Sequence, residues 1–165
     1  MSIDYIVSSL PALSFGAPAP LSPARLRETC GGVWPDVVEP LLRRDWADLD
    51  VQLRNAIAEA RGGERYRRPA RGCSQYWRSR VLACFQESDV MRREEFLDRV
   101  RWDAAGELTQ PADPLGPGAL ATYAVRLEII ARRDRISAEA GGAAFDRLTA
   151  GTRAPKIGKS ESVKA

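Results

Sequence analysis

Apolar residues recur along most of this chain at the three- and four-residue spacing that is typical of amphipathic helices. The clearest pattern runs from Asp36 to Ala60, and further patterns cover residues 74–85 and 89–106. No segment shows the strict apolar and polar alternation over about four to eight residues that marks a half-buried strand. The hydrophobic pattern therefore predicts an all-α fold.

Capping residues and glycine pairs divide this pattern into six or seven helices. Ser22 followed by Pro23 is an N-cap with proline at the first helical position. The glycine pair at 62–63 follows the longest pattern, where a helix C-terminus favours glycine. We expect helices over residues 3–10, 22–30, 36–60, 74–85, 89–106, 120–136 and 145–148. Because residues 151–165 lack apolar periodicity, we expect one compact helical domain over 1–150, followed by a flexible, disordered basic tail.

The helix expected over 89–106 has one apolar and one charged face, and Ser88 with Asp89 offers its cap. Its apolar positions are Met91, Phe96, Leu97, Val100 and Trp102. Its charged positions are Glu94, Glu95, Asp98, Arg99 and Arg101. We expect the apolar set to face the core and the charged set to face water.

Composition bounds the size and the chemistry of the protein. The 165 residues, 44% of them hydrophobic, suffice for one domain with a real core. The chain contains no histidine, which excludes Ser-His-Asp and Cys-His nucleophilic sites and histidine-ligated zinc. We therefore expect no enzymatic activity, no cofactor and no metal site.

Two short patterns resemble nucleotide-binding motifs, but neither has the required context. Gly158-Lys159-Ser160 lacks the earlier glycine of a phosphate-binding loop, because Arg153 stands there. The segment 116–121 satisfies a GxGxxA pattern, yet it follows a proline-rich loop instead of a strand. We interpret its glycines as part of a capping loop.

The cysteines and the N-terminus bear on the compartment. Cys30, Cys73 and Cys84 form no CxxC pair, which favours free, buried thiols in a reducing environment. The apolar start of the chain contains Asp4 and Pro11 and has no basic residue before Arg25, unlike a signal peptide. We expect a cytoplasmic protein, or one that is peripheral on the inner face of the cell membrane.

The strongest electrostatic feature is the segment from Arg61 to Arg80. Seven arginines stand there against one acid, Glu64, which gives a local charge of +6. Interleaved aromatic residues make it a candidate partner-binding segment. The candidate contacts are Arg65, Tyr66, Arg67, Arg68, Arg71, Tyr76, Trp77 and Arg78. The same chemistry suits nucleic acid or anionic lipid, and a solvated loop whose arginines pair with acids on neighbouring helices explains it equally well.

The first thirty residues carry an ordered series of short motifs. They read Tyr5-Ile-Val-Ser-Ser-Leu10-Pro11-Ala-Leu13-Ser-Phe15-Gly16, then Pro18, Pro20, Ser22 and Cys30. This series resembles the opening of a small bacterial family of formally unknown function. That family is encoded among the genes of bacterial V/A-type ATP synthases and is often labelled as similar to the spacer subunit of their central stalk.

The resemblance implies a non-catalytic helical subunit or accessory protein of a rotary ATPase. The spacer subunit of such a machine joins the central stalk to the membrane rotor ring without binding nucleotide. The implied partners are stalk and ring subunits. From the Arg61–Arg80 segment we expect the basic loop to contact acidic subunits or anionic head groups at the membrane surface. The alternative from another class is a helical nucleic-acid-binding module that uses the Arg61–Arg80 segment.

Overall fold

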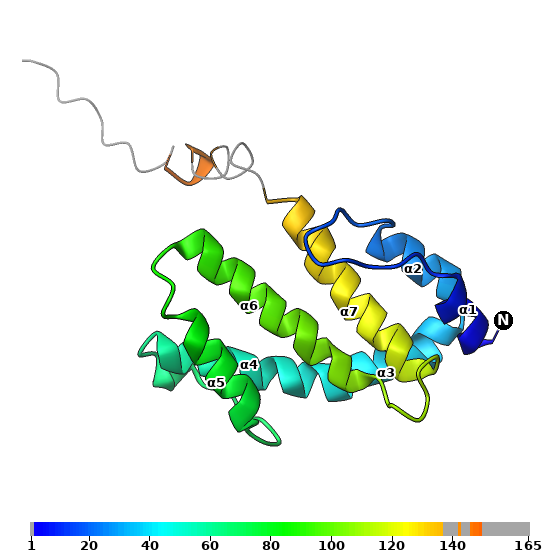
Figure 1. Cartoon of the computed structure of the whole chain (residues 1–165), viewed down its shortest axis with the longest axis horizontal. Coiled ribbons are helices and arrows are strands. Elements are labelled where there is room, and N and C mark those ends of the chain that lie inside the picture. Colours follow the sequence, from blue (N-terminus) through cyan, green and yellow to red (C-terminus); the bar gives the residue numbers. More distant parts are fainter. Residues whose placement is uncertain (1, 137–141, 143–145, 150–165) are drawn as a thin grey trace, which may run out of the picture. The chain divides into compact units, whose positions relative to one another are not determined.

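The computed structural model describes residues 2–136, 142 and 146–149 of the chain. Within these residues it contains helices and no strand, so the predicted all-α fold is confirmed (Figure 1). The α-helices are α1 (Ile3–Ser9), α2 (Pro23–Cys30), α3 (Glu39–Leu41), α4 (Ala47–Ala60), α5 (Gln75–Cys84), α6 (Val90–Ala105) and α7 (Pro117–Asp134). The chain divides into two units: unit 1 ends at Arg133, and the second unit begins at Asp134.

Predicted helix boundaries agree with the structure to within a few residues. The Ser22 hydroxyl accepts a hydrogen bond from the Arg25 N–H at 3.1 Å, as an N-cap does. Asp89, and not Ser88, caps α6 by accepting from the Arg92 N–H at 2.9 Å. Of the closing helix expected over 145–148, residues 146–149 are helical, whereas Phe145 and the expected tail lie outside the described residues.

The long helix expected from Asp36 begins at Trp34 and continues to Ala60, with two π-helical segments in its first half. These are η1 (Trp34–Val38) and η2 (Leu42–Trp46), and they flank α3. Pro40 lies in α3, where it has no N–H to donate and its ring crowds the preceding turn. The regular hydrogen-bond ladder is therefore interrupted around Pro40, and the helix adopts the wider form on either side.

Gly62 ends α4 in the left-handed conformation, with φ +69°. Its N–H donates to the Glu59 carbonyl at 2.9 Å, and the Gly63 N–H donates to the Ala58 carbonyl at 2.8 Å. This pair of bonds is a Schellman motif, which satisfies the last carbonyls of the helix. The predicted role of the glycine pair is confirmed.

Unit 1 is held together by three apolar clusters. The first lies between α4, α5 and α6 and includes Leu53, Val81 and Leu97. The second joins α1, α2 and η1 to α7 around Ile6, Leu26, Val38 and Leu127. The third joins α6 to α7 and includes Trp102 and Ile129. The helices α6 and α7 thus connect the two ends of the unit.

The expectation for α6 is wrong at three positions. Met91 and Phe96 were expected in the core, but they are 67% and 46% exposed. Asp98 was expected to face water, but it is 3% exposed. The buried stripe instead contains Leu97, Val100 and Trp102, as predicted.

Asp98 is buried because it meets arginines from two helices. Its carboxylate accepts hydrogen bonds from Arg101 at 3.1 Å and from Arg132 of α7, and Arg133 of α7 lies 3.6 Å away. The three guanidinium groups offset the desolvation of the carboxylate. Asp98 is therefore a charged link between α6 and the C-terminal part of α7.

We expect Asp98→Asn to lower the free energy of unfolding by about 2–3 kcal/mol, because it leaves three arginines together without their common anion. Urea unfolding followed by circular dichroism measures this loss. Glu94→Gln is the matched control: Glu94 is about half exposed, so losing its pair with Arg61 should change stability by less than about 1 kcal/mol. Equal effects of the two substitutions would contradict the role given to Asp98.

Gly118 provides a second test of the packing. It lies in the first turn of α7, where a Cβ would overlap the carbonyl oxygen of Leu108. Alanine normally stabilises a helix by about 1 kcal/mol relative to glycine. We nevertheless expect Gly118→Ala to destabilise the protein by about 2 kcal/mol, because the backbone at Leu108 must move to make room for the new Cβ. Gly106→Ala is the control, since its Cβ would meet only the flexible end of Arg126 at 3.4 Å. Thermal unfolding that ranks the two variants in the opposite order would overturn this explanation.

Candidate interaction surface

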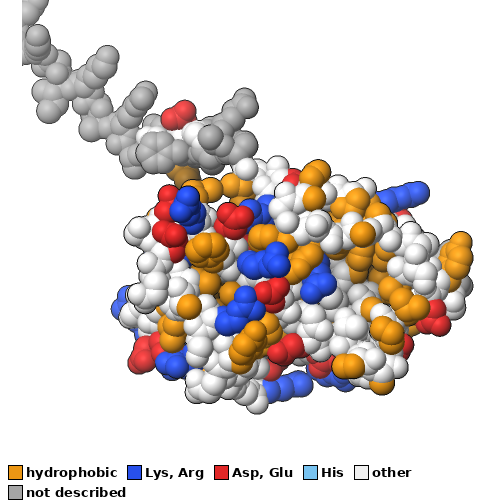
Figure 2. Space-filling model, in the orientation of Figure 1, with side chains coloured by type: hydrophobic (Ala, Val, Ile, Leu, Met, Phe, Trp, Pro, Cys, Tyr) orange, Lys and Arg blue, Asp and Glu red, His pale blue; other side chains and the backbone are white. Residues whose placement is uncertain are grey.

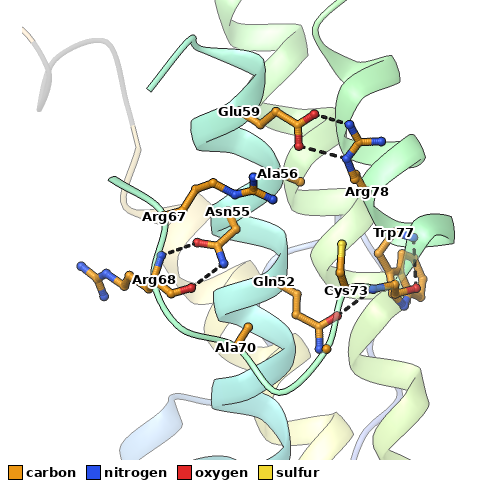
Figure 3. Close-up of a pocket in the computed structure, with 12 residues that line it drawn as sticks. Gln52, Asn55, Ala56, Glu59, Arg67, Arg68, Ala70, Cys73, Trp77 and Arg78 are labelled. Atoms are coloured by element: carbon orange, nitrogen blue, oxygen red, sulfur yellow. Dashed lines mark hydrogen bonds and ion pairs between the residues drawn. The ribbon is translucent and has the colours of Figure 1, made fainter. Parts of the chain in front are cut away.

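One face of α4 carries a stripe of polar residues, Asp48, Gln52, Asn55 and Glu59, spaced four, three and four residues apart. This spacing places the four side chains one above another on the same side of the helix. Each of them binds a residue of the segment that follows the helix, as Figure 3 shows for three of them. We call these four residues the α4 polar stripe.

The α4 polar stripe holds the backbone of the loop. The Asn55 amide donates to the Arg68 carbonyl at 2.8 Å, and its oxygen accepts from the Arg68 N–H at 2.8 Å. A carboxylate oxygen of Asp48 accepts from the Arg71 N–H at 2.7 Å. These bonds replace the partners that the loop backbone lacks because it has no secondary structure there. The backbone that carries the arginines is therefore positioned by α4.

The next contact joins the end of the loop to the start of α5. The Gln52 side-chain oxygen accepts from the Ser74 N–H at 3.0 Å. The Ser74 hydroxyl caps α5 by accepting from the Trp77 N–H at 3.4 Å. Gln52 therefore determines where α5 begins relative to α4.

The last contact of the stripe is an ion pair between Glu59 and Arg78. The Arg78 Nε lies 2.9 Å from one carboxylate oxygen, and its Nη2 donates to the other. The hydrogen bond from Arg78 lowers the pKa of the Glu59 carboxyl, and the same bond raises the pKa of Arg78. Such a bidentate pair combines charge with fixed geometry.

Three of the seven arginines in the basic segment pair with acids on neighbouring helices. Besides Arg78, Arg61 lies 3.1 Å from Glu94, and Arg80 lies 2.8 Å from Asp103. For these arginines the interpretation as an internally paired segment is confirmed. They contribute to the packing of α4, α5 and α6, and their charges are largely neutralised.

The other four arginines, Arg65, Arg67, Arg68 and Arg71, have exposed side chains and no ion pair with any residue of the described part of the chain. Two tyrosines accompany them: Tyr66 is 65% exposed and Tyr76 is 62% exposed. We call these six residues the arginine surface. Tyr66 belongs to the short helix η3 (Glu64–Tyr66) and lies against the guanidinium of Arg65, 4.8 Å from the ring centre.

The sequence analysis predicted that Trp77 and Arg78 contact a partner, but both side chains make their contacts inside the protein. Trp77 is only 4% exposed and packs in the cluster of α4, α5 and α6. Its indole N–H donates to Glu107, so both the ring and its polar group are used inside the protein. Arg78 is half-buried and is held by Glu59. Because both side chains are engaged within the protein, these two residues are not part of the arginine surface.

The sequence analysis did not identify the α4 polar stripe. Its signal was present, because polar side chains recur at helical spacing along Asp48–Glu59. An amphipathic helix normally shows such a face to water, so nothing in the pattern distinguished these residues from solvated ones. The binding partners lie 13 to 23 residues away along the chain and become apparent only in three dimensions.

A hollow of about 200 Å³ lies between the α4 polar stripe and the loop (Figure 3). Arg67, Cys73 and Arg78 are among its lining residues.

Cys73 is exposed, contrary to the expectation of three buried cysteines. Cys30 and Cys84 are buried, and burial raises the pKa of both thiols. All three cysteines are free, as predicted.

Figure 2 shows one face of the molecule, on which arginines and acids lie close together between apolar side chains. Among the described residues, no group of three or more acids or cysteines is arranged to hold a metal ion. No helix in this part of the chain combines the length and the apolar character needed to cross a bilayer. The described surface is thus mixed in charge, and four arginines without an ion pair lie together on one loop.

Fold and surface together define an all-helical protein that presents a positioned, arginine-rich loop. Comparisons with known protein families, with curated proteins and with solved structures each found no match for this chain.

Several of the N-terminal residues that carry the resemblance make packing contacts or hydrogen bonds within the protein. Ile6 and Cys30 are buried, the Pro11 carbonyl accepts a hydrogen bond from Tyr123, and Phe15 packs edge-on against Trp102.

The α4 polar stripe makes a testable claim about the order of the loop. We expect Asn55→Ala to speed trypsin cleavage after Arg65, Arg67 and Arg71 about fivefold, because it removes two hydrogen bonds that restrain local opening. Limited proteolysis followed by mass spectrometry measures the rate. Arg54→Gln is the control, since Arg54 pairs with Asp50 on its own helix and not with the loop. Unchanged cleavage in the Asn55 variant would show that other contacts hold the loop.

Proposed function

We propose that this protein is a non-catalytic subunit or accessory protein of a bacterial V/A-type rotary ATPase, which binds an acidic surface of a partner subunit through the arginine surface. The observation that carries the contact is the group of four exposed, unpaired arginines on a loop held by α4. The resemblance of the first thirty residues supports the choice of machine. On this proposal the protein works in the cytoplasm or at the inner face of the membrane.

The physical chemistry of the arginine surface suits a protein partner. Arginine and tyrosine are frequent anchors of protein interfaces. A guanidinium binds a carboxylate through two parallel hydrogen bonds, which adds direction to the attraction. Because the Arg68 and Arg71 backbones are already hydrogen-bonded to α4, little loop ordering remains to be done on binding.

A nucleic-acid-binding module is the second candidate, and the exposed rings of Tyr66 and Tyr76 favour it. Two observations weigh against it. Each ring already has an arginine of the same chain near it, Arg65 at 4.8 Å and Arg80 at 5.9 Å. Acids on α4 and α6 also neutralise three of the seven arginines, so less charge remains for a phosphate backbone.

Copurification from the native cells in mild detergent tests the proposal. We expect tagged protein to recover rotary ATPase stalk and ring subunits. The triple variant Arg67→Glu, Arg68→Glu and Arg71→Glu should reduce that recovery at least about tenfold, because it removes three anchoring contacts and adds repulsion. Mass spectrometry of the eluate provides the measurement.

The control for charge is the triple variant Arg25→Glu, Arg43→Glu and Arg92→Glu, which makes the same change in net charge outside the arginine surface. It should retain the partners, and both variants should show the circular dichroism spectrum of the native protein. Recovery of nucleic acid or ribosomal proteins alone, in a salt-sensitive manner, would favour the second candidate. Unchanged recovery of ATPase subunits with the first variant would refute the role of the arginine surface.

A further inference from the structure

We propose that the hollow between α4 and the loop is an anchor site for a single carboxylate side chain of an acidic peptide segment, with Arg67 as its binding residue. This inference rests on the proposed function, because it names the group of the partner that the arginine surface recognises. It also makes a claim about one site, whereas the proposed function concerns the whole surface.

The geometry singles out Arg67 among the exposed arginines. Arg67 and Arg68 are adjacent in the loop, but Arg67 reaches across α4 towards Ala56, whereas Arg68 extends away from the helix (Figure 3). Arg78, on the opposite wall, is already bound by Glu59. Arg68 also lines the hollow, but its side chain extends away from it. The charge of Arg67 acts on Glu59 without forming an ion pair with it, so Arg67 is the guanidinium that can bind a ligand in the hollow.

The walls of the hollow suit a short aliphatic stem. Ala56 and Trp77 line it and are each 4% exposed, so they form an apolar floor. The side chains of glutamate and aspartate each consist of such a stem and a carboxylate. The stem would lie on the apolar floor, and the carboxylate would lie against Arg67. The walls are held by the hydrogen bonds of Asn55 and Gln52, so the site exists before a ligand arrives.

Size and charge restrict the occupant further. The volume of about 200 Å³ is below the roughly 300–1,000 Å³ of typical small-molecule sites, and this favours one side chain over a whole cofactor. Glu59 lies in the same hollow, and its carboxylate would repel a phosphate dianion more strongly than a monoanion. One free guanidinium matches one carboxylate in both charge and planar geometry.

Cys73 supplies a built-in reporter for the test. It lines the hollow and is exposed, while Cys30 and Cys84 are buried. Iodoacetamide is uncharged, so its approach to the thiol is not steered by the arginines. The rate of Cys73 alkylation in the full-length protein, followed by mass spectrometry, therefore reports whether the hollow is occupied, and Cys73→Ser confirms which thiol is read.

The probe is a terminally blocked peptide of ten glutamates, compared with a peptide of ten glutamines and with inorganic phosphate. We expect saturating glutamate peptide to slow Cys73 alkylation at least about threefold, and the glutamine peptide to have no effect. Arg67→Gln should abolish this protection. Arg65→Gln should retain it, because Arg65 is also exposed but does not line the hollow. Each variant is compared with itself without peptide, so a change in the intrinsic reactivity of Cys73 does not affect the result.

Three results would overturn the inference: no protection of the native protein, equal protection in the Arg67 variant, or protection by phosphate as strong as by the peptide. The copurification experiment separates this failure from failure of the proposed function. If the triple variant loses the ATPase subunits but the glutamate peptide does not protect Cys73, the anchor site is wrong and the proposed function stands. If the peptide protects Cys73 through Arg67 but the tagged native protein recovers no ATPase subunits, the anchor site stands and the proposed function is wrong.

Discussion

The hydrogen bonds between the α4 polar stripe and the backbone of residues 68–74 are the constraint on which the exposed chemistry of this protein depends. The other side of α4 packs Leu49 and Leu53 into the cluster shared with α5 and α6. One helix thus joins the apolar core to a loop whose apolar residues are all small: Pro69, Ala70 and Cys73. Backbone groups of such a loop would otherwise be satisfied by water and would be free to move. Because side chains of α4 take the place of that water, the backbone that carries the arginines is held in one position before a partner binds.

Arginine performs several tasks in this protein that lysine would perform less well. All three lysines lie in the last ten residues, so arginine is the only cation of the remaining chain. Guanidinium groups pair with acids between helices, as at Asp98, and they also stack on aromatic rings. Arg99 and Arg133 lie 5.1 and 5.0 Å from the ring centre of Phe15, which brings the segment before α2 against α6 and α7. A high arginine content therefore does not by itself indicate a binding surface, and only the four unpaired arginines of the loop carry the functional proposal.

The two lines of support for the proposed function come from different parts of unit 1. The residues of the N-terminal resemblance pack mainly in the cluster of α1, α2 and α7, where Ile6 and Cys30 are buried. The arginine surface lies beside the cluster of α4, α5 and α6. The residues that carry the resemblance thus pack the part of unit 1 around α1, α2 and α7. The loop, in contrast, supplies the exposed groups with which the part around α4, α5 and α6 can bind a partner. A result that removes one of these lines leaves the other in place.

The sequence by itself determined the helices, several caps and the glycine that ends α4, because these depend on residues close together in the chain. It also located the basic segment and the candidate residues Arg65 to Arg71. Only the tertiary structure decided which charges are free. Asp98 and Trp77 are buried, and Met91 and Cys73 are exposed, because partners distant in sequence cover some faces and leave others open. Periodicity identifies the faces of a helix, but which face a neighbouring helix covers depends on how the whole chain packs.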